Sequence, residues 1–304
     1  MKFSSTALVV GTLAVLPMLP MLPASAASLF TGLGAASGYS LVSLGSDAEF
    51  NINSGPLTGD ILVGQGTKLS SSGGGGGVIT GRVDYDNTTN IDGLNSLNTA
   101  PSPSQLNPVP TTQTSQALTD ARALAAYAAS LTSPGDSLGK VDGINFAATG
   151  AVTAFLVDEA KGALTFTGTA GQKIVVNVAN KLSSNNPWSL LGGIRSEDLL
   201  INYLGTGNVF STSGGGAQFG THLAAIGNGN QNFQFSNLNL AGALVNTEGK
   251  IQFVSGSQIT ASEPFTPIPT PALLPGLVGM GVAALRKRKA EEGELSEAKV
   301  LERV

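Results

Sequence analysis

The chain of 304 residues carries a net charge of −4, a single histidine and no cysteine. No disulfide framework, thiolate nucleophile or lipid-modified cysteine can therefore exist, and one histidine cannot build a multi-histidine metal site. Glycine is abundant, with 40 residues, whereas charged residues make up 12% and aromatic residues 6%. Such a composition is typical of short strands joined by tight turns. The acidic balance argues against nucleic acid as a partner.

The first 26 residues are predicted to be a secretory signal peptide. Lys2 precedes an apolar run from Ala7 to Leu22, and Ala24-Ser25-Ala26 forms a small-residue cleavage site that would leave Ala27 as the first mature residue. Prolines in and after the run weaken a helix that stays in the membrane, which is the alternative interpretation. Export would require the secretion translocon and signal peptidase as partners.

The body, residues 27–262, is predicted to form one β-rich domain. From Tyr39 onward, short apolar bursts are separated by glycine, asparagine or serine, and many alternate apolar and polar residues as half-buried strands do. Their irregular spacing suits an antiparallel β-sandwich as well as a β-solenoid. The expected strands are 39–44, 49–52, 60–63, 78–83, 164–166, 174–178, 199–203, 218–223, 233–235, 238–245 and 251–254.

Acidic residues supply the candidates for a metal site or an enzyme. Asp84, Asp86 and Asp92 are the best calcium candidates, because hard cations bind several oxygen ligands that lie close together. An ordinary turn rich in asparagine and aspartate is the favoured interpretation, so no metal or other cofactor is expected. Paired carboxylates could cleave a polysaccharide only if they faced one groove about 5–9.5 Å apart. The available pairs are Asp47/Glu49, Asp84/Asp86, Asp158/Glu159 and Glu197/Asp198.

One helix is predicted in the middle of the body, from Gln116 to Leu131. This segment lacks glycine and proline and places leucine and alanine at helical spacing. Thr114 or Ser115 would cap its start, and the Pro-Gly pair after it would end it. The stretch before it, residues 98–114, contains four prolines and is predicted to be an extended connector without a strand.

This order of elements resembles the choice-of-anchor A domains of bacterial surface proteins and the wider group of ice-binding-like β-solenoids. The likeness covers most of Tyr39–Ile259 and is carried by residues 174–178, 199–204 and 220–225. The last of these, Gly220-Thr221-His222-Leu223-Ala224-Ala225, is similar to the group's Gly-Thr-x-Leu-Ala element. The resemblance implies a mainly β fold, a right-handed parallel β-solenoid with one packed helix; a β-sandwich is the alternative.

No catalytic set is visible in the body. His222 is the only possible base for a serine triad, but no Gly-x-Ser-x-Gly elbow accompanies it, and it is expected on or beside a strand surface. Trp188 could stack on a sugar, although a lone tryptophan more often belongs to the core or its rim. We therefore expect a protein that is not an enzyme.

The C-terminal end has the order of a membrane-sorting signal. A Pro/Thr spacer, residues 263–271, is followed by an apolar segment from Ala272 to Leu285 and by the basic cluster Arg286-Lys287-Arg288-Lys289. As a helix, the 14 apolar residues would reach about 21 Å, which is less than a hydrocarbon core of about 30 Å. The segment 272–289 is therefore predicted to be a short hydrophobic helix that spans only transiently, with its basic cluster on the cytoplasmic side.

Pro269-Thr270-Pro271-Ala272, the leucine- and glycine-rich run and the basic cluster together resemble the PEP-CTERM sorting tails in their PTPA variant. The resemblance covers only the C-terminal end. It implies a bacterial exported protein that an exosortase-type enzyme processes near these four residues. Such tails usually stop soon after the basic cluster, whereas this chain continues through an acidic tail, residues 290–304.

Together these features predict an exported protein of the cell surface or extracellular matrix, anchored in the membrane during sorting. Its body would be adhesive or structural and could bind extracellular polysaccharide. A polysaccharide-active enzyme and an ice-binding protein are the alternatives. Ice binding would require a flat array of threonine and alanine, and Thr165, Thr167 and Thr169 form the only regular run in the sequence.

Overall fold

The computed structural model describes residues 32–260, apart from 46–47, 53–55, 71–77, 92–93, 95–100 and 228–229. The predicted signal peptide, the predicted sorting segment and Asp92 lie outside these residues. Within the described part of the chain, no helix is both long enough and apolar enough to cross a membrane.

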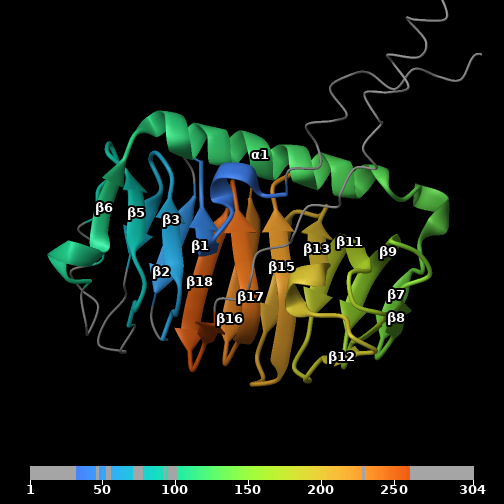
Figure 1. The fold of residues 1–304 in the computed structure, drawn as a ribbon. Helices are drawn as coiled ribbons and strands as arrows, with labels where there is room; N and C mark the ends of the chain where they lie inside the picture. Colours follow the sequence, from blue (N-terminus) through green and yellow to red (C-terminus); the bar gives the residue numbers. More distant parts are fainter. Residues whose placement is uncertain are drawn as a thin grey trace, which may run out of the picture.

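The chain forms a parallel β-solenoid, in which the strands of successive coils stack side by side (Figure 1). The strand pairings are parallel, which excludes the β-sandwich and confirms the predicted solenoid. Apolar side chains point inward at alternate positions of the strands and form one continuous core. The described strands are β1 (Tyr39–Ser43), β2 (Glu49–Ile52), β3 (Asp60–Val63), β4 (Lys68–Ser70), β5 (Val83–Asp86), β6 (Leu106–Val109), β7 (Lys140–Asp142), β8 (Asn145–Ala147), β9 (Val152–Lys161), β10 (Thr165–Thr167), β11 (Lys173–Ser183), β12 (Ser189–Leu191), β13 (Leu199–Tyr203), β14 (Gly207–Thr212), β15 (Ala217–Ala224), β16 (Gln231–Ser236), β17 (Asn239–Asn246), β18 (Lys250–Ser255) and β19 (Gln258–Thr260).

The coils are not stacked in the order of the sequence. β1 lies in the middle of the solenoid, and β3, β5 and β6 extend from it to one end. The helix α1 (Thr111–Ser130) then crosses to the other end, from which β9, β11, β13, β15 and β17 return to the middle. At the seam, β17 pairs with β1, with Leu244 beside Leu41. Blue and orange strands are therefore neighbours in Figure 1.

The strands make three faces. The helix-covered face contains β6, β5, β3, β1, β13 and the adjoining halves of β17, β15, β11 and β9. The charged face contains β4, β2, β18, β16, β14, the second halves of β11 and β9, and β7. The uncharged face contains β8, β10, β12, the first halves of β15 and β17, β19, and the bridging residues Leu57 and Ile79.

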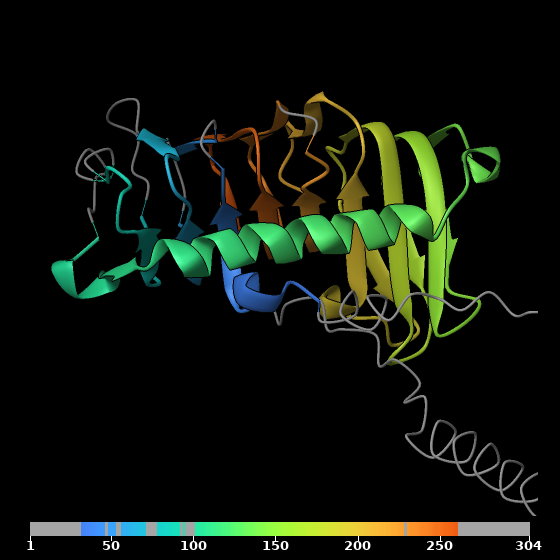
Figure 2. The same ribbon diagram turned by 90° about the horizontal axis from the view of Figure 1, so that it is seen from above.

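The helix α1 lies lengthwise over the helix-covered face (Figure 2). It buries a stripe of small residues and one leucine, in agreement with the predicted helical spacing. The short 3-10 helix η2 (Gly34–Ala36) packs against it, and the backbone N–H of Ala35 donates to Asp120 at 2.9 Å. The buried residues of the helix are Thr114, Ala117, Ala121, Leu124, Ala125 and Ala128. The other 3-10 helices of the described residues are η4 (Pro103–Gln105), η5 (Pro134–Asp136) and η6 (Ser196–Asp198).

The structure corrects the predicted start of the helix. The helix begins at Thr111 rather than at Gln116, because Pro110 supplies a fixed φ of −68° directly before the first turn. Thr114 lies inside the helix and does not cap it; its hydroxyl donates to Asp86 at 2.8 Å. The connector also contains a strand, β6, which pairs with β5 at the edge of the solenoid. Its Pro108 is tolerated there because an edge strand can lack a backbone donor.

Candidate binding faces

The helix-covered face is filled from within the protein. Val175, Leu200, Leu223 and Val245 point outward from consecutive strands and form a second apolar cluster with the buried stripe of α1. Burial of this cluster holds the helix on the sheet through the hydrophobic effect. The face is therefore not open to a ligand, and the charged and uncharged faces are the candidates.

The charged face presents polar side chains from in-register strands. Three ion pairs cross it: Lys140 with Glu159 at 2.9 Å, Lys161 with Asp142 at 3.2 Å, and Lys250 with Glu49 at 3.2 Å. Next to the ion pairs runs an uncharged polar row, which we call the polar row, at the strand spacing of about 4.7–4.9 Å. The polar row consists of Ser183, Ser211, Gln234 and Gln252, and Asn51 continues its register on β2 but is buried.

The uncharged face presents mostly small side chains, and none of its described outward positions carries a charge. Between them lie the buried residues Phe146, Phe166, Leu240 and Ile259, so the alternate residues must point outward. The outward residues are Asn145, Ala147, Thr165, Thr167, Ser189, Leu191, Ala217, Phe219, Asn239, Ala241, Gln258, Thr260, Thr58 and Thr80.

Threonines that are far apart in the sequence meet on this face. The backbone N–H of Thr58 donates to Ile259 at 2.9 Å, and that of Thr80 donates to Leu57 at 3.1 Å. These ladder bonds place Thr260, Thr58 and Thr80 side by side on three successive coils. The sequence showed only the run Thr165/Thr167/Thr169, of which Thr169 lies beyond strand β10. The row was missed because coil order, and not sequence spacing, brings these residues together.

His222 does not lie on a strand surface, as we predicted, but in the interior. It occupies the inward row of β15 between Ile201 and Leu244 and is fully buried. Its ring stacks on Phe210 at 4.4 Å and an angle of 4°, and its Nδ1 lies 2.8 Å from the Tyr203 hydroxyl. Burial lowers the pKa of His222 to about 3, so the ring is neutral at pH 7.

Trp188 is also a core residue. It is 3% exposed, its Nε1 donates to the Ser184 hydroxyl at 2.9 Å, and its ring lies 5.4 Å from Phe166. A tryptophan in this position cannot stack on a bound sugar. The core interpretation of the sequence is therefore correct, and the residue stabilises the interior through its aromatic contacts.

Asp84 and Asp86, the described calcium candidates, bind protein groups. Asp84 accepts hydrogen bonds from Tyr39 and Asn107 and pairs with Arg82 at 2.8 Å. Burial, followed by the hydrogen bond to Asp84, raises the pKa of Tyr39 to about 12.

Asp86 accepts hydrogen bonds from Thr88 and Thr114. Although burial acts to raise the pKa of Asp86, these bonds outweigh it and lower the pKa. Asp86 thus fixes the first turn of α1 to β5 through Thr114, and Asp84 links β5 to β1 and β6. No group of three or more metal-ligating side chains occurs among the described residues.

The other acidic pairs do not converge on one groove. Glu159 binds Lys140, and its neighbour Asp158 binds Asn180 at the corner between the helix-covered and charged faces. Asp198 forms a buried ion pair with Lys173 at 2.6 Å, next to the uncharged face. Of the first pair, Asp47 lies outside the described residues and Glu49 pairs with Lys250. Among the described residues, none of the four predicted pairs therefore has both carboxylates facing one groove.

Comparison with known proteins supports the fold alone. No protein-family model and no curated protein matches the sequence. Among solved structures, an ice-binding protein from an Antarctic biological consortium is 15% identical, with a TM-score of 0.51 over 82% of this chain and 96% of that chain. An ice-binding protein from an Arctic yeast is 18% identical, with a TM-score of 0.50 over 81% and 99% of the two chains.

A third solved structure, the ice-binding protein from an Antarctic bacterium of the Flavobacteriaceae, is 18% identical with a TM-score of 0.50. The match covers 80% of this chain but 48% of that chain. These likenesses agree with a solenoid fold and a packed helix, and their low identity says nothing of the ligand.

Proposed function

We propose that this is a non-catalytic binding protein of the cell exterior, exported by its N-terminal segment and sorted by its C-terminal one. The observation that best supports a binding role is the uncharged face, where small side chains from successive coils lie in line. Such rows repeat at about 4.7–4.9 Å and suit a ligand that is itself extended and regular. Because an extended, regular ligand would fit this regular row of side chains, we infer an adhesive role on the cell surface or in the matrix.

The chemistry of the face favours a neutral extracellular polysaccharide. Asn145, Thr165 and Ser189 lie in register on three strands and offer amide and hydroxyl groups to sugar hydroxyls. Leu191, which is 50% exposed, and the half-buried Phe219 offer apolar surface to sugar rings. An enzyme is disfavoured, because the only histidine is buried and neutral and the described acidic pairs are held by other protein groups.

Ice is the second candidate ligand. It is favoured by the in-register row Thr260, Thr58 and Thr80, and by the fold that this chain shares with solved ice-binding proteins. The Thr80 hydroxyl, however, donates to the backbone oxygen of Leu57 at 3.3 Å and is partly engaged. We therefore rank ice behind polysaccharide.

One set of variants tests both ligands. Thr165→Lys and Thr260→Lys place a long charged side chain on the uncharged face, and Thr119→Lys places the same change on the exposed side of α1. We expect wild type and Thr119→Lys to co-sediment with matrix polysaccharide from the native host, and the two face variants to lose most of this binding. If binding survives in both face variants, the uncharged face is not the adhesive surface. Thermal hysteresis in wild type that the face variants lack would identify ice instead.

A further inference from the structure

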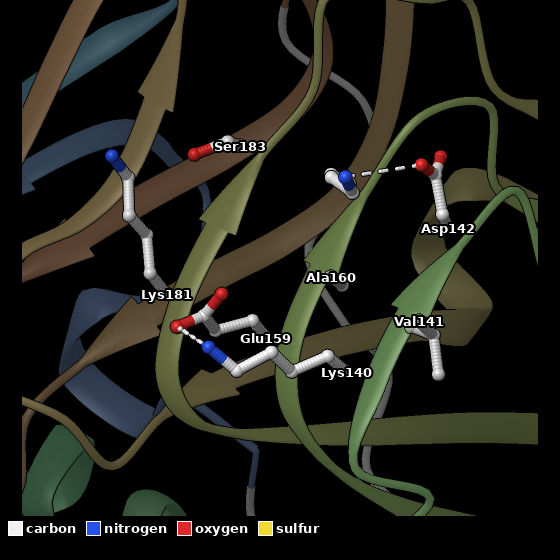
Figure 3. Close-up of a pocket in the computed structure, with 8 residues that line it drawn as sticks. Lys140, Val141, Asp142, Glu159, Ala160, Lys181 and Ser183 are labelled. Carbon is white, nitrogen blue, oxygen red and sulfur yellow. Dashed lines mark hydrogen bonds and ion pairs between the residues drawn. The ribbon is translucent and has the colours of Figure 1, made fainter.

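A cleft lies at one end of the charged face, away from the uncharged face of the proposed function. It has a volume of about 350 Å³ and is lined by three neighbouring strands, β7, β9 and β11 (Figure 3). Three lysines and two carboxylates surround it: Lys140, Lys161, Lys181, Asp142 and Glu159.

The cleft contains three lysines but only two carboxylates, so one lysine remains outside the ion pairs within the cleft. Lys140 is bound by Glu159, and Lys161 by Asp142. Lys181 on β11 lies in register with Glu159 on β9, on the side of Glu159 opposite to Lys140. Its side chain is exposed and makes no hydrogen bond or ion pair with any described residue. In Figure 3 the dashed lines that mark ion pairs join Lys140 to Glu159 and Lys161 to Asp142, and none is drawn to Lys181. Its ammonium group therefore remains available to an anion.

The charge of this face differs in sign from that of the whole protein. Five lysines and three carboxylates point outward from its strands, whereas the chain has a net charge of −4. Asp158, at the corner before the face, is bound to Asn180. A local positive surface on an acidic protein attracts anions to that surface. The lysines are Lys68, Lys140, Lys161, Lys181 and Lys250, and the carboxylates are Glu49, Asp142 and Glu159.

The cleft opens onto the polar row. Ser183 lines the cleft and begins the row, and its hydroxyl lies 3.3 Å from that of Ser211 on the next strand. From Ser183 to Gln252 the row crosses four strands, and three steps of about 4.8 Å give a length of about 14 Å. Hydroxyl and amide groups at each step both donate and accept hydrogen bonds, as sugar hydroxyls do.

We propose that the cleft and the polar row bind an acidic polysaccharide that carries carboxylate groups. A carboxylate of the polymer binds Lys181 and the Ser183 hydroxyl, and the sugar chain crosses the strands along the polar row. The sugar is favoured over other polyanions because the row beyond the cleft is uncharged, so it matches hydroxyl groups and not a continuous line of phosphates. This site is independent of the proposed function.

Affinity electrophoresis of the full chain tests the proposal. The gels contain polygalacturonate, neutral dextran or polyphosphate. Lys181→Gln removes the free cation, and Arg195→Gln is the matched control, since it removes one exposed positive charge outside the charged face. We expect polygalacturonate to retard wild type and Arg195→Gln, Lys181→Gln to weaken binding at least about fivefold, and 1 M salt to abolish it.

Several results would overturn the assignment. These are no retardation of wild type by polygalacturonate, equal weakening by both variants, or equal retardation by dextran. Retardation by polyphosphate alone would rule out the sugar. Thr260→Lys should leave the polygalacturonate result unchanged, so failure here is distinguishable from failure of the proposed function. Equal melting temperatures of the variants confirm that each is folded.

Discussion

The side-chain amide of Asn202 donates to the side-chain oxygen of Asn177 on the neighbouring strand at 2.8 Å. The same two amides bind the helix above them, Asn202 to the carbonyl of Ala125 at 3.1 Å and Asn177 to that of Ala128 at 2.7 Å. Three residues of helix rise about 4.5 Å, and adjacent strands lie about 4.7–4.9 Å apart. The two asparagines thus fix the register of the helix on the sheet.

Replacing Asn177 should therefore destabilise the protein. In Asn177→Leu, the Asn202 amide and the Ala128 carbonyl lose a partner in a fully buried site, which should reduce the free energy of unfolding by about 1–3 kcal/mol. Asn180→Leu is the control, because Asn180 lies on the same strand but is exposed. Urea unfolding of both variants measures the difference. Similar small losses would show that the helix does not depend on this contact.

The helix stripe gives a second prediction. Ala121 is fully buried, so Ala121→Asp should cost several kcal/mol through an unpaired buried charge, about 3 or more. Arg122 is the next residue, has a half-exposed side chain and pairs with Glu248. Arg122→Ala should cost less than about 1 kcal/mol, since surface ion pairs contribute little. Equal effects in thermal unfolding would contradict the packing of α1.

His222 should make the protein sensitive to acid. Its pKa is about 3 in the folded state, well below the ordinary histidine pKa of 6.5 that applies in the unfolded chain. The unfolded state therefore binds the proton more readily below pH 6.5. The stabilising contribution is complete above pH 6.5 and is lost as the pH falls toward 3, by roughly 5 kcal/mol in total.

The variant His222→Phe tests this dependence. It keeps an aromatic ring against Phe210 but cannot titrate. We expect the free energy of unfolding to fall less between pH 6.5 and 4 in the variant than in wild type. Carboxylates contribute equally to both proteins, so the difference reports His222. Parallel pH curves would mean that the histidine is not buried in the neutral form.

The C-terminal segment lies outside the described residues, and its role stays a prediction. Changing Arg286, Lys287, Arg288 and Lys289 to Gln removes the positive charge that would keep this end cytoplasmic. The variant should escape to the medium, with its β body still folded. Deletion of residues 290–304 should change little. Cell fractionation measures both, and unchanged retention after the four substitutions would refute the sorting signal.

The sequence predicted the positions of the strands and the helix better than it predicted which strands lie side by side in the solenoid. The strands at Tyr39–Ser43, Leu199–Tyr203 and Lys250–Ser255 and the helical stripe were expected from alternation and helical spacing. The order of the coils was not predicted from the sequence. It depends on pairings such as that of Leu41 with Leu244, two residues that are far apart in the chain and become neighbours because α1 crosses from one end of the solenoid to the other. The same long-range order decides which side chains share a face. It also explains the error at His222, since alternation gives two sides of a strand but does not say which side is inside.

The crossing helix also constrains the length of the molecule. It lies over the coils on its way from β6 at one end to β7 and β9 at the other, at about three helix residues per coil. An extra coil would move the two ends apart while the helix kept its length, and the chain could then no longer reach its next strand. The length of the helix therefore sets the number of coils that the solenoid can contain. Adding or removing one coil must be accompanied by the insertion or deletion of about three residues in α1.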